Sequence, residues 1–339
     1  MANPYSILSF GEFYDGISHQ SSLSSEAAGK LGASPHGALG YYLSTFTWGL
    51  GWVPSLAAVG GVVTIWRDDR LVGGVLVPTG VVFLAILSAE TRYFGRWILP
   101  LFPIVCLLSA YFLVKLTTWA ARLARPNSRW SQGVLIGAVA ILALGQGMIY
   151  SVHSDLILSR PFTFALAHEW LVTHVPRGSR VVVEPEVPNS WLEYAPGSLE
   201  RVAGRRYRWT KLPNLQTVGA GQSVRTINRE NYERTLRPAL IAYYELHRYC
   251  WVITFTSESG RALVTPAALP DAVAYYRELA SQADFTYRVS PYNHRLNTEA
   301  FNFDWTFDYY PLGYERPGPE VIVYHLSRAG CGGSRVGHD

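Results

Sequence analysis

The stretch 71–88 reads LVGGVLVPTGVVFLAILS and contains no charged side chain. A helix that crosses the hydrocarbon core of a bilayer needs about 20 mostly apolar residues, so this stretch predicts a membrane span. Three further apolar runs lie near it, at about 42–66, 97–119 and 133–152. A buried helix of a soluble protein can imitate one such run. Four in succession, with short polar connections, predict a polytopic α-helical membrane domain.

Tryptophan and tyrosine are enriched at the two interfaces of a membrane, where one end of the ring system is wet and the other apolar. Aromatic residues of this kind lie at the ends of the predicted spans, namely Tyr41, Tyr42, Trp66, Trp97, Trp119, Trp130 and Tyr150. Their positions support the four spans.

Basic residues gather in two of the connections and so predict the orientation. The ends of the first and third spans, with the connections that follow, carry Arg67, Arg70, Lys115, Arg122, Arg125 and Arg129. The connection between the second and third spans carries only Arg92 and Arg96. Since Lys and Arg favour the cytoplasmic side, we expect a multi-pass plasma (inner) membrane protein. Its N-terminal segment, the Arg92 connection and the C-terminal half would lie outside.

The second half of the chain has the composition of a water-soluble domain. Helix-like segments at 162–174, 231–247 and 271–282 alternate with strand-like segments at 180–184, 249–254, 285–289 and 319–326, which favours an α/β fold. The expected order is an extracytoplasmic segment (1–40), transmembrane helices (41–153), a small extracytoplasmic α/β domain (154–327) and a disordered tail (328–339).

Composition and motifs exclude several classes of function. The net charge is only +4, and no basic stripe with interleaved aromatic residues predicts a nucleic-acid partner. There is no glycine-rich phosphate loop, no GxSxG motif and no paired metal-ligand cysteines. His168 and His174 are six residues apart and do not share a helical face, so a metal site is not predicted. Whether Cys250 and Cys331 pair is left open, because two cysteines carry little spacing information.

Two acidic positions outside the spans are candidates for contact with a sugar or an acceptor. Asp304 and Trp305 belong to the aromatic and acidic stretch NFDWTFDYY at 302–310; such a stretch can stack on a sugar, or it can be a loop packed on its own domain. Asp15, with Glu12 and His19 nearby, is a second candidate. Its alternative interpretation is a simple turn in an external loop.

The stretch ETRYFGRWILPLFP at 90–103 resembles the late membrane region of GT-C glycosyltransferases. More narrowly, it is similar to the lipid-carrier-dependent branch that includes protein O-mannosyltransferases and aminoarabinose transferases. Shorter similarities are NPYSIL at 3–8, WGLGW at 48–52, VPRGSR at 175–180 and RPGP at 316–319. Such enzymes have a large helical membrane bundle, with an added extracytoplasmic domain in many bacterial cases.

The resemblance implies a membrane enzyme that takes a sugar from a polyprenyl-phosphate carrier and passes it to an acceptor outside the cell. Arg92, Tyr93 and Arg96 would bind the phosphate of the carrier, because arginine's planar fork suits bidentate phosphate binding. The alternative is that both arginines are interfacial anchors that extend to lipid headgroups.

The same resemblance implies that part of the enzyme is absent from this chain. The family's catalytic aspartate lies in the first large external loop, and its members have more than four spans. We therefore expect a C-terminal portion, which an N-terminal partner polypeptide would complete, and assign no catalytic residue. No cofactor is assigned, and a requirement for a divalent metal is left open.

Two other functions compete with the enzyme. One is a non-enzymatic membrane anchor that presents a glycan- or protein-binding module. The other is a transporter, which is disfavoured because the spans carry almost no ionisable residues apart from arginines near their edges.

Overall fold

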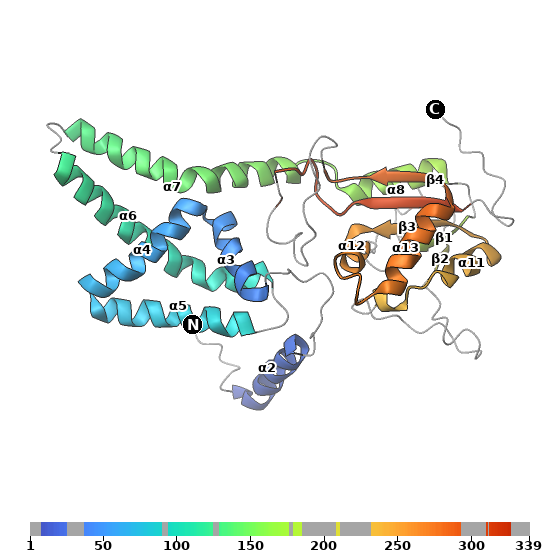
Figure 1. The fold of residues 1–339 in the computed structure, drawn as a ribbon, viewed down its shortest axis with the longest axis horizontal. Coiled ribbons are helices and arrows are strands. Elements are labelled where there is room, and N and C mark those ends of the chain that lie inside the picture. The colour runs from blue at the N-terminus through green and yellow to red at the C-terminus, as the bar shows by residue number, and fades with distance from the viewer. Residues whose placement is uncertain are drawn as a thin grey trace. The chain divides into compact units, whose positions relative to one another are not determined.

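A computed structural model describes residues 8–25, 37–89, 94–124, 129–175, 179–184, 208–210, 232–292, 310 and 312–326. The chain divides into two compact units, with the main division between Asp155 and Leu156 and with Tyr310 grouped with the first unit (Figure 1). The first unit holds the apolar helices and the second holds a β-sheet with its helices. Each unit is described by itself.

The first unit consists of seven helical elements within its described residues. They are α2 (Phe10–Ser25), α3 (Gly37–Gly49), α4 (Trp52–Asp68), α5 (Arg70–Ala89), the 3-10 helix η1 (Gly95–Leu101), α6 (Phe102–Ala124) and α7 (Arg129–Leu158). Three described stretches are long and apolar enough to cross a membrane, at Arg70–Ala89, Gly95–Arg122 and Gly133–His174. The bent pair α3 and α4 adds a fourth if it forms one broken span. Sidedness stays a prediction.

The span predicted at about 42–66 is not one continuous helix, because the chain bends by 114° between α3 and α4. Gly51 lies at the bend with a φ of 100°, a conformation that residues with a Cβ rarely adopt. An apolar composition predicts that a segment is buried in lipid or protein. It does not predict where the helix bends.

Helices α4 and α6 approach each other closely along a row of small residues. A Cβ on Gly61 would lie 2.1 Å from the backbone oxygen of Leu108, and a Cβ on Gly60 would lie 2.6 Å from the ring of Phe112. Small residues let helix backbones pack closely inside a membrane, where dispersion contacts replace the hydrophobic effect. Ala57, on the same helix, is also buried.

The turn between α4 and α5 contacts α6. At the end of α4, Asp68 accepts a hydrogen bond from the Tyr111 hydroxyl at 2.7 Å and pairs with Lys115 at 3.1 Å. The next residue, Asp69, caps α5 by accepting the backbone N–H groups of Leu71 and Val72 at 3.0 and 3.1 Å. These contacts hold the turn between α4 and α5 beside the C-terminal part of α6.

The second unit is a mixed five-stranded sheet with the strand order β2-β1-β3-β5-β4. Strands β2, β1 and β3 are parallel, whereas β5 is antiparallel to both β3 and β4. The elements are α8 (Thr163–His174), β1 (Arg180–Val183), β2 (Arg208–Thr210), η4 (Glu233–Thr235), α11 (Ala239–Leu246), β3 (Tyr249–Phe255), α12 (Thr256–Val264), α13 (Pro270–Gln282), β4 (Ala283–Val289) and β5 (Val321–Leu326). The predicted small α/β domain is thereby confirmed. Its extracytoplasmic position stays a prediction.

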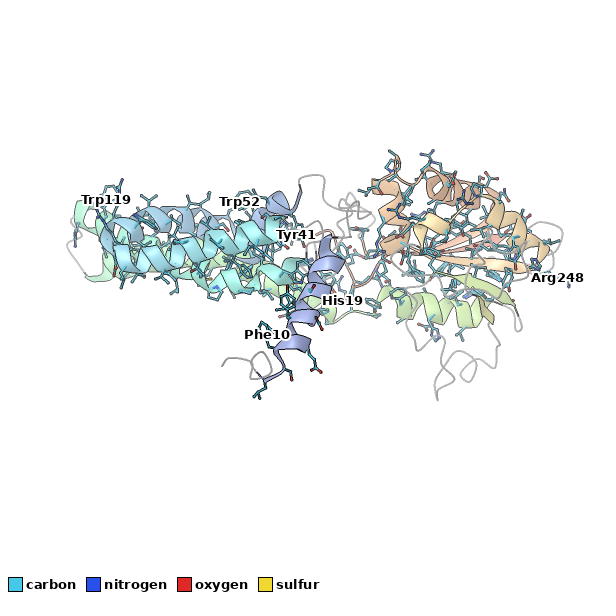
Figure 2. All side chains as sticks on the ribbon, turned by 90° about the horizontal axis from the view of Figure 1, so that it is seen from below. Phe10, His19, Tyr41, Trp52, Trp119 and Arg248 are labelled. Carbon is cyan, nitrogen blue, oxygen red and sulfur yellow. The ribbon has the colours of Figure 1, made fainter. Side chains whose placement is uncertain are left out.

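Helices cover both faces of this sheet, with α8 and α13 on opposite sides (Figure 2). The α8 face buries Phe164 and Leu171 against Trp251, Ile253 and Val323. The segment predicted as one helix at 231–247 is instead η4 followed by α11. Pro238 lies between them, and proline disfavours helical conformation in the residue before it.

The structure shows the state of two of the three cysteines. Cys106 is a free thiol, and Cys250 is disulfide-bonded. Cys331 and the expected disordered tail at 328–339 lie outside the described residues.

A buried carboxylate ties the parallel strands to α13. Glu184, directly after β1, accepts the backbone N–H of Phe255 and the hydroxyl of Tyr276, each at 2.6 Å. Burial is the main reason that the pKa of Tyr276 lies well above its ordinary value, so this hydroxyl stays protonated and donates. The contact joins the ends of β1 and β3 to the helix layer.

Four buried tyrosines predict the behaviour of this domain in alkali. Desolvation raises the pKa values of Tyr232, Tyr244, Tyr275 and Tyr276. In the unfolded chain a tyrosine titrates near pH ~10. The stability that comes from keeping them protonated is therefore complete below about pH 10 and falls as the pH rises beyond it. We expect tyrosinate absorbance from these residues to appear together with loss of the domain's circular dichroism. Their titration near pH 10 with the dichroism unchanged would contradict their burial.

Candidate functional site

The 3-10 helix η1 connects the residues after α5 to α6 and carries Arg96. Phe94 comes directly before it, and the backbone N–H of Trp97 donates to the Phe94 carbonyl at 3.0 Å. Pro100 lies within η1 and Pro103 in the first turn of α6. Proline is tolerated in a first helical turn, where its missing N–H would have no partner within the helix. The sequence therefore favours a short tight helix here, followed by a new α-helix.

The Arg96 side chain is exposed and packs against the ring of Phe94. Its guanidinium carbon lies 4.3 Å from the centroid of the Phe94 ring, a distance typical of a cation–π contact. Phe94 is itself buried and meets Trp97 edge-on, with 5.1 Å between ring centroids. These contacts present a positive charge at the surface of η1.

Buried residues of η1 fix its position against α3. Ile98 and Leu101 pack in one cluster with Tyr41, Tyr42 and Phe46 of α3. Because α3 is turned away from α4 by the bend at Gly51, its aromatic side chains reach η1. The bend is thus part of what supports Arg96.

An apolar groove of about 270 Å³ lies between α3, α4, α5 and α6 and includes Leu101 of η1. Phe46, Leu84 and Ile104 are among its lining residues. The single hydroxyl in the lining, that of Ser55, already donates to the Gly51 carbonyl at 2.7 Å. The groove therefore suits a chain of apolar groups and offers no polar contact of its own.

One end of η1 lines the groove, and Arg96 lies near its other end. Leu101 lines the groove and Arg96 lies five residues before it in the same helix. At a rise of about 2.0 Å per residue, the two positions are roughly 10 Å apart along the helix. A ligand with an apolar chain and an anionic head can span that distance.

Gln146 of α7 holds the bend between α3 and α4. Its Oε1 accepts the backbone N–H of Trp52, and its Nε2 donates to the Thr47 carbonyl, both at 3.0 Å. The first and last backbone groups of a helix lack partners inside it, and an unpaired group is costly in a bilayer. Sequence reasoning did not single out Gln146; the signal was one amide in the apolar run 133–152.

The structure describes only some of the candidate residues that were predicted from the sequence. Arg96 is exposed on η1, the helix whose Leu101 lines the groove. Arg92, Tyr93, Asp304 and Trp305 lie outside the described residues. Asp15 is exposed on α2, so the alternative interpretation of its segment as a turn is wrong.

Metal ligands do not gather within the part of the chain that the structure describes: no group of three or more His, Cys, Asp or Glu side chains there could hold an ion. Two buried carboxylates of the second unit, those of Glu233 and Glu258, share one arginine. Arg261 pairs with Glu233 at 3.2 Å and with Glu258 at 3.4 Å, which ties α12 to η4.

Comparisons with protein-family models, with curated proteins and with solved structures found no match.

Proposed function

We propose that this chain is a membrane glycosyltransferase, or the C-terminal portion of one, that uses a polyprenyl-phosphate sugar as donor. The sugar would pass to an acceptor on the extracytoplasmic face. The observation that carries the proposal is the apolar groove that reaches η1, the helix on which Arg96 stands. The resemblance of 90–103 to lipid-carrier-dependent transferases supports the same donor.

The two halves of the donor match the two parts of the site. A polyprenyl chain is an unbroken run of apolar groups and fits a groove without free polar atoms. Its phosphate carries negative charge, which Arg96, with Arg92 and Tyr93 of the preceding connection, would bind. When the bond between the sugar and the phosphate oxygen breaks, charge accumulates on the leaving phosphate, and fixed cationic donors stabilise that charge.

The acceptor side of the reaction needs a base to take up the proton of the attacking group. The resemblance assigns that role to an external aspartate that this chain does not match. The proposed contribution of this chain is to bind the donor and to stabilise the leaving group, and a partner polypeptide would supply the base.

Filling the groove tests the role of its apolar lining. A Cβ on Gly80 would lie 3.8 Å from Ile104 and 3.9 Å from Leu101, so Gly80→Phe projects a ring into the groove. We expect affinity for a fluorescent polyprenyl phosphate in nanodiscs to fall at least tenfold, about 1.4 kcal/mol. Gly74→Phe is the matched control on the same helix, because a Cβ there has nothing within 4 Å. Equal affinity of both variants would remove the groove from the proposal.

A transfer assay tests the proposal as a whole. Membranes that contain the chain, together with any polypeptide encoded next to it, are supplied with a radiolabelled polyprenyl-phosphate sugar. We expect the label to leave the lipid fraction, and to do so only when the chain is present. Label that stays on the lipid, together with no measurable affinity for the carrier, would favour the non-enzymatic membrane anchor.

A further inference from the structure

Helix α2 presents an apolar stripe on its surface. Phe10, Phe13, Tyr14 and Ile17 follow the spacing i, i+3, i+4, i+7 and are 64%, 38%, 61% and 51% exposed. The rings of Phe10 and Tyr14 stack with their centroids 6.3 Å apart. Figure 2 shows the helix with Phe10 near its first turn and His19 in its later half. An exposed stripe of this kind indicates a surface that binds something apolar.

The side chains of Glu12, Asp15 and His19 lie on the opposite face of α2. At 3.6 residues per turn, the four apolar positions cover an arc of about 100°, and Glu12, Asp15 and His19 lie roughly opposite its centre. The helix contains no Lys or Arg. The part of the helix from Phe10 to His19 is therefore amphipathic, with Glu12 and Asp15 on its polar face.

Covalent connection keeps α2 near the membrane helices. Only residues 26–36 separate its last residue from Gly37, where α3 begins. Eleven residues span at most about 40 Å. The helix itself, with 16 residues, is too short and too polar to cross a bilayer, which takes about 20 mostly apolar residues.

We propose that α2 is an interfacial helix that binds the lipid surface. The stripe of Phe10, Phe13, Tyr14 and Ile17 would enter the boundary between headgroups and acyl chains, while Glu12 and Asp15 face water. Aromatic residues favour this zone, and amphipathic helices bind there through their buried apolar area. Because α2 lacks basic residues, its binding does not depend on anionic lipid. The inference holds whether or not the chain transfers a sugar.

Spin labels on the full-length chain in phosphatidylcholine nanodiscs test this placement. Cysteines are introduced singly as Phe13→Cys or Ile17→Cys, with Glu12→Cys and Asp15→Cys as matched controls. The background is Cys106→Ser, which removes the free thiol found among the described residues. Collision with oxygen reports contact with lipid, and collision with a nickel chelate reports contact with water. We expect the ratio of oxygen to nickel collisions to be severalfold higher at positions 13 and 17 than at 12 and 15.

Two other outcomes would overturn the proposal. High nickel collision at all four positions would mean that the helix lies in water. Exclusion of both reagents at positions 13 and 17 would mean that the stripe is covered by protein. In a second arm, part of the phosphatidylcholine is replaced by phosphatidylglycerol, and we expect the ratios at 13 and 17 to stay the same. A marked rise there would contradict binding through apolar contact alone.

Discussion

Arg96→Ala is expected to lower transfer from a polyprenyl-phosphate sugar by about 10²–10³-fold, the loss typical of removing one fixed donor to developing negative charge. The guanidinium carbon of Arg96 lies 4.3 Å from the centroid of the Phe94 ring. This contact restricts the positions that the guanidinium can adopt before the phosphate binds. Arg96→Lys keeps the charge but loses the planar fork, and we expect an intermediate loss. The readouts are the rate of transfer and the affinity for the carrier.

The matched control for Arg96→Ala is Arg70→Ala. Arg70 is also exposed and begins α5, one helix length away from η1. If Arg96 were only an interfacial anchor, its loss would have the small effect expected of Arg70. Transfer by Arg96→Ala at the rate of Arg70→Ala would therefore contradict the phosphate role.

The largest expected effect on stability comes from Gly61→Ala. The added Cβ would lie 2.1 Å from the Leu108 carbonyl oxygen, and that oxygen cannot rotate away because it belongs to the α6 backbone. Helices α4 and α6 must separate, at a cost of about 3 kcal/mol or more, the upper part of the range for overpacking. We expect a clear fall in the denaturation midpoint of the chain in detergent.

Alanine substitutions at two other glycines, Gly60 and Gly74, serve as comparisons for Gly61→Ala. At Gly60 the obstacle is the ring of Phe112, which can move, so Gly60→Ala should destabilise less. At Gly74 nothing lies within 4 Å, and alanine favours a helix over glycine by about 1 kcal/mol, so Gly74→Ala should be neutral or stabilising. Equal midpoints for Gly61→Ala and Gly74→Ala would contradict the close packing of α4 on α6.

Residue patterns predicted those parts of the fold that depend on local composition. The apolar runs at 71–88, 97–119 and 133–152 correspond to α5, to η1 with α6, and to α7. The apolar and β-branched segment before residue 255 corresponds to β3. Helix α12 was not predicted because its sequence, TSESGRALV, is mostly polar. Its buried face is made of Glu258, Ser259, Gly260 and Ala262, which follow no apolar stripe.

The sequence predicted one described residue of the candidate site, Arg96. It did not predict the groove or the contacts of Gln146. Arg96 was a candidate because the stretch at 90–103 resembles lipid-carrier-dependent transferases. The groove was hidden because four helices, α3 to α6, contribute its wall, and no segment alone carries its pattern. Gln146 gives no local sign that it pairs with backbone groups about one hundred positions earlier, at Thr47 and Trp52. These features depend on how helices meet, which periodicity does not report.

The most direct test of the account is to map where a polyprenyl phosphate binds. The full chain in nanodiscs is irradiated with a polyprenyl phosphate that carries a photoreactive group in its first isoprene units, and the labelled peptides are sequenced. We expect labelling within the groove, at residues of α3, α5 and α6 such as Phe46, Leu84 and Ile104. Excess unlabelled carrier should suppress it, free phosphate should not, and Arg96→Ala should reduce it. Labelling spread over all lipid-facing helices, unaffected by the carrier or by Arg96→Ala, would contradict the account.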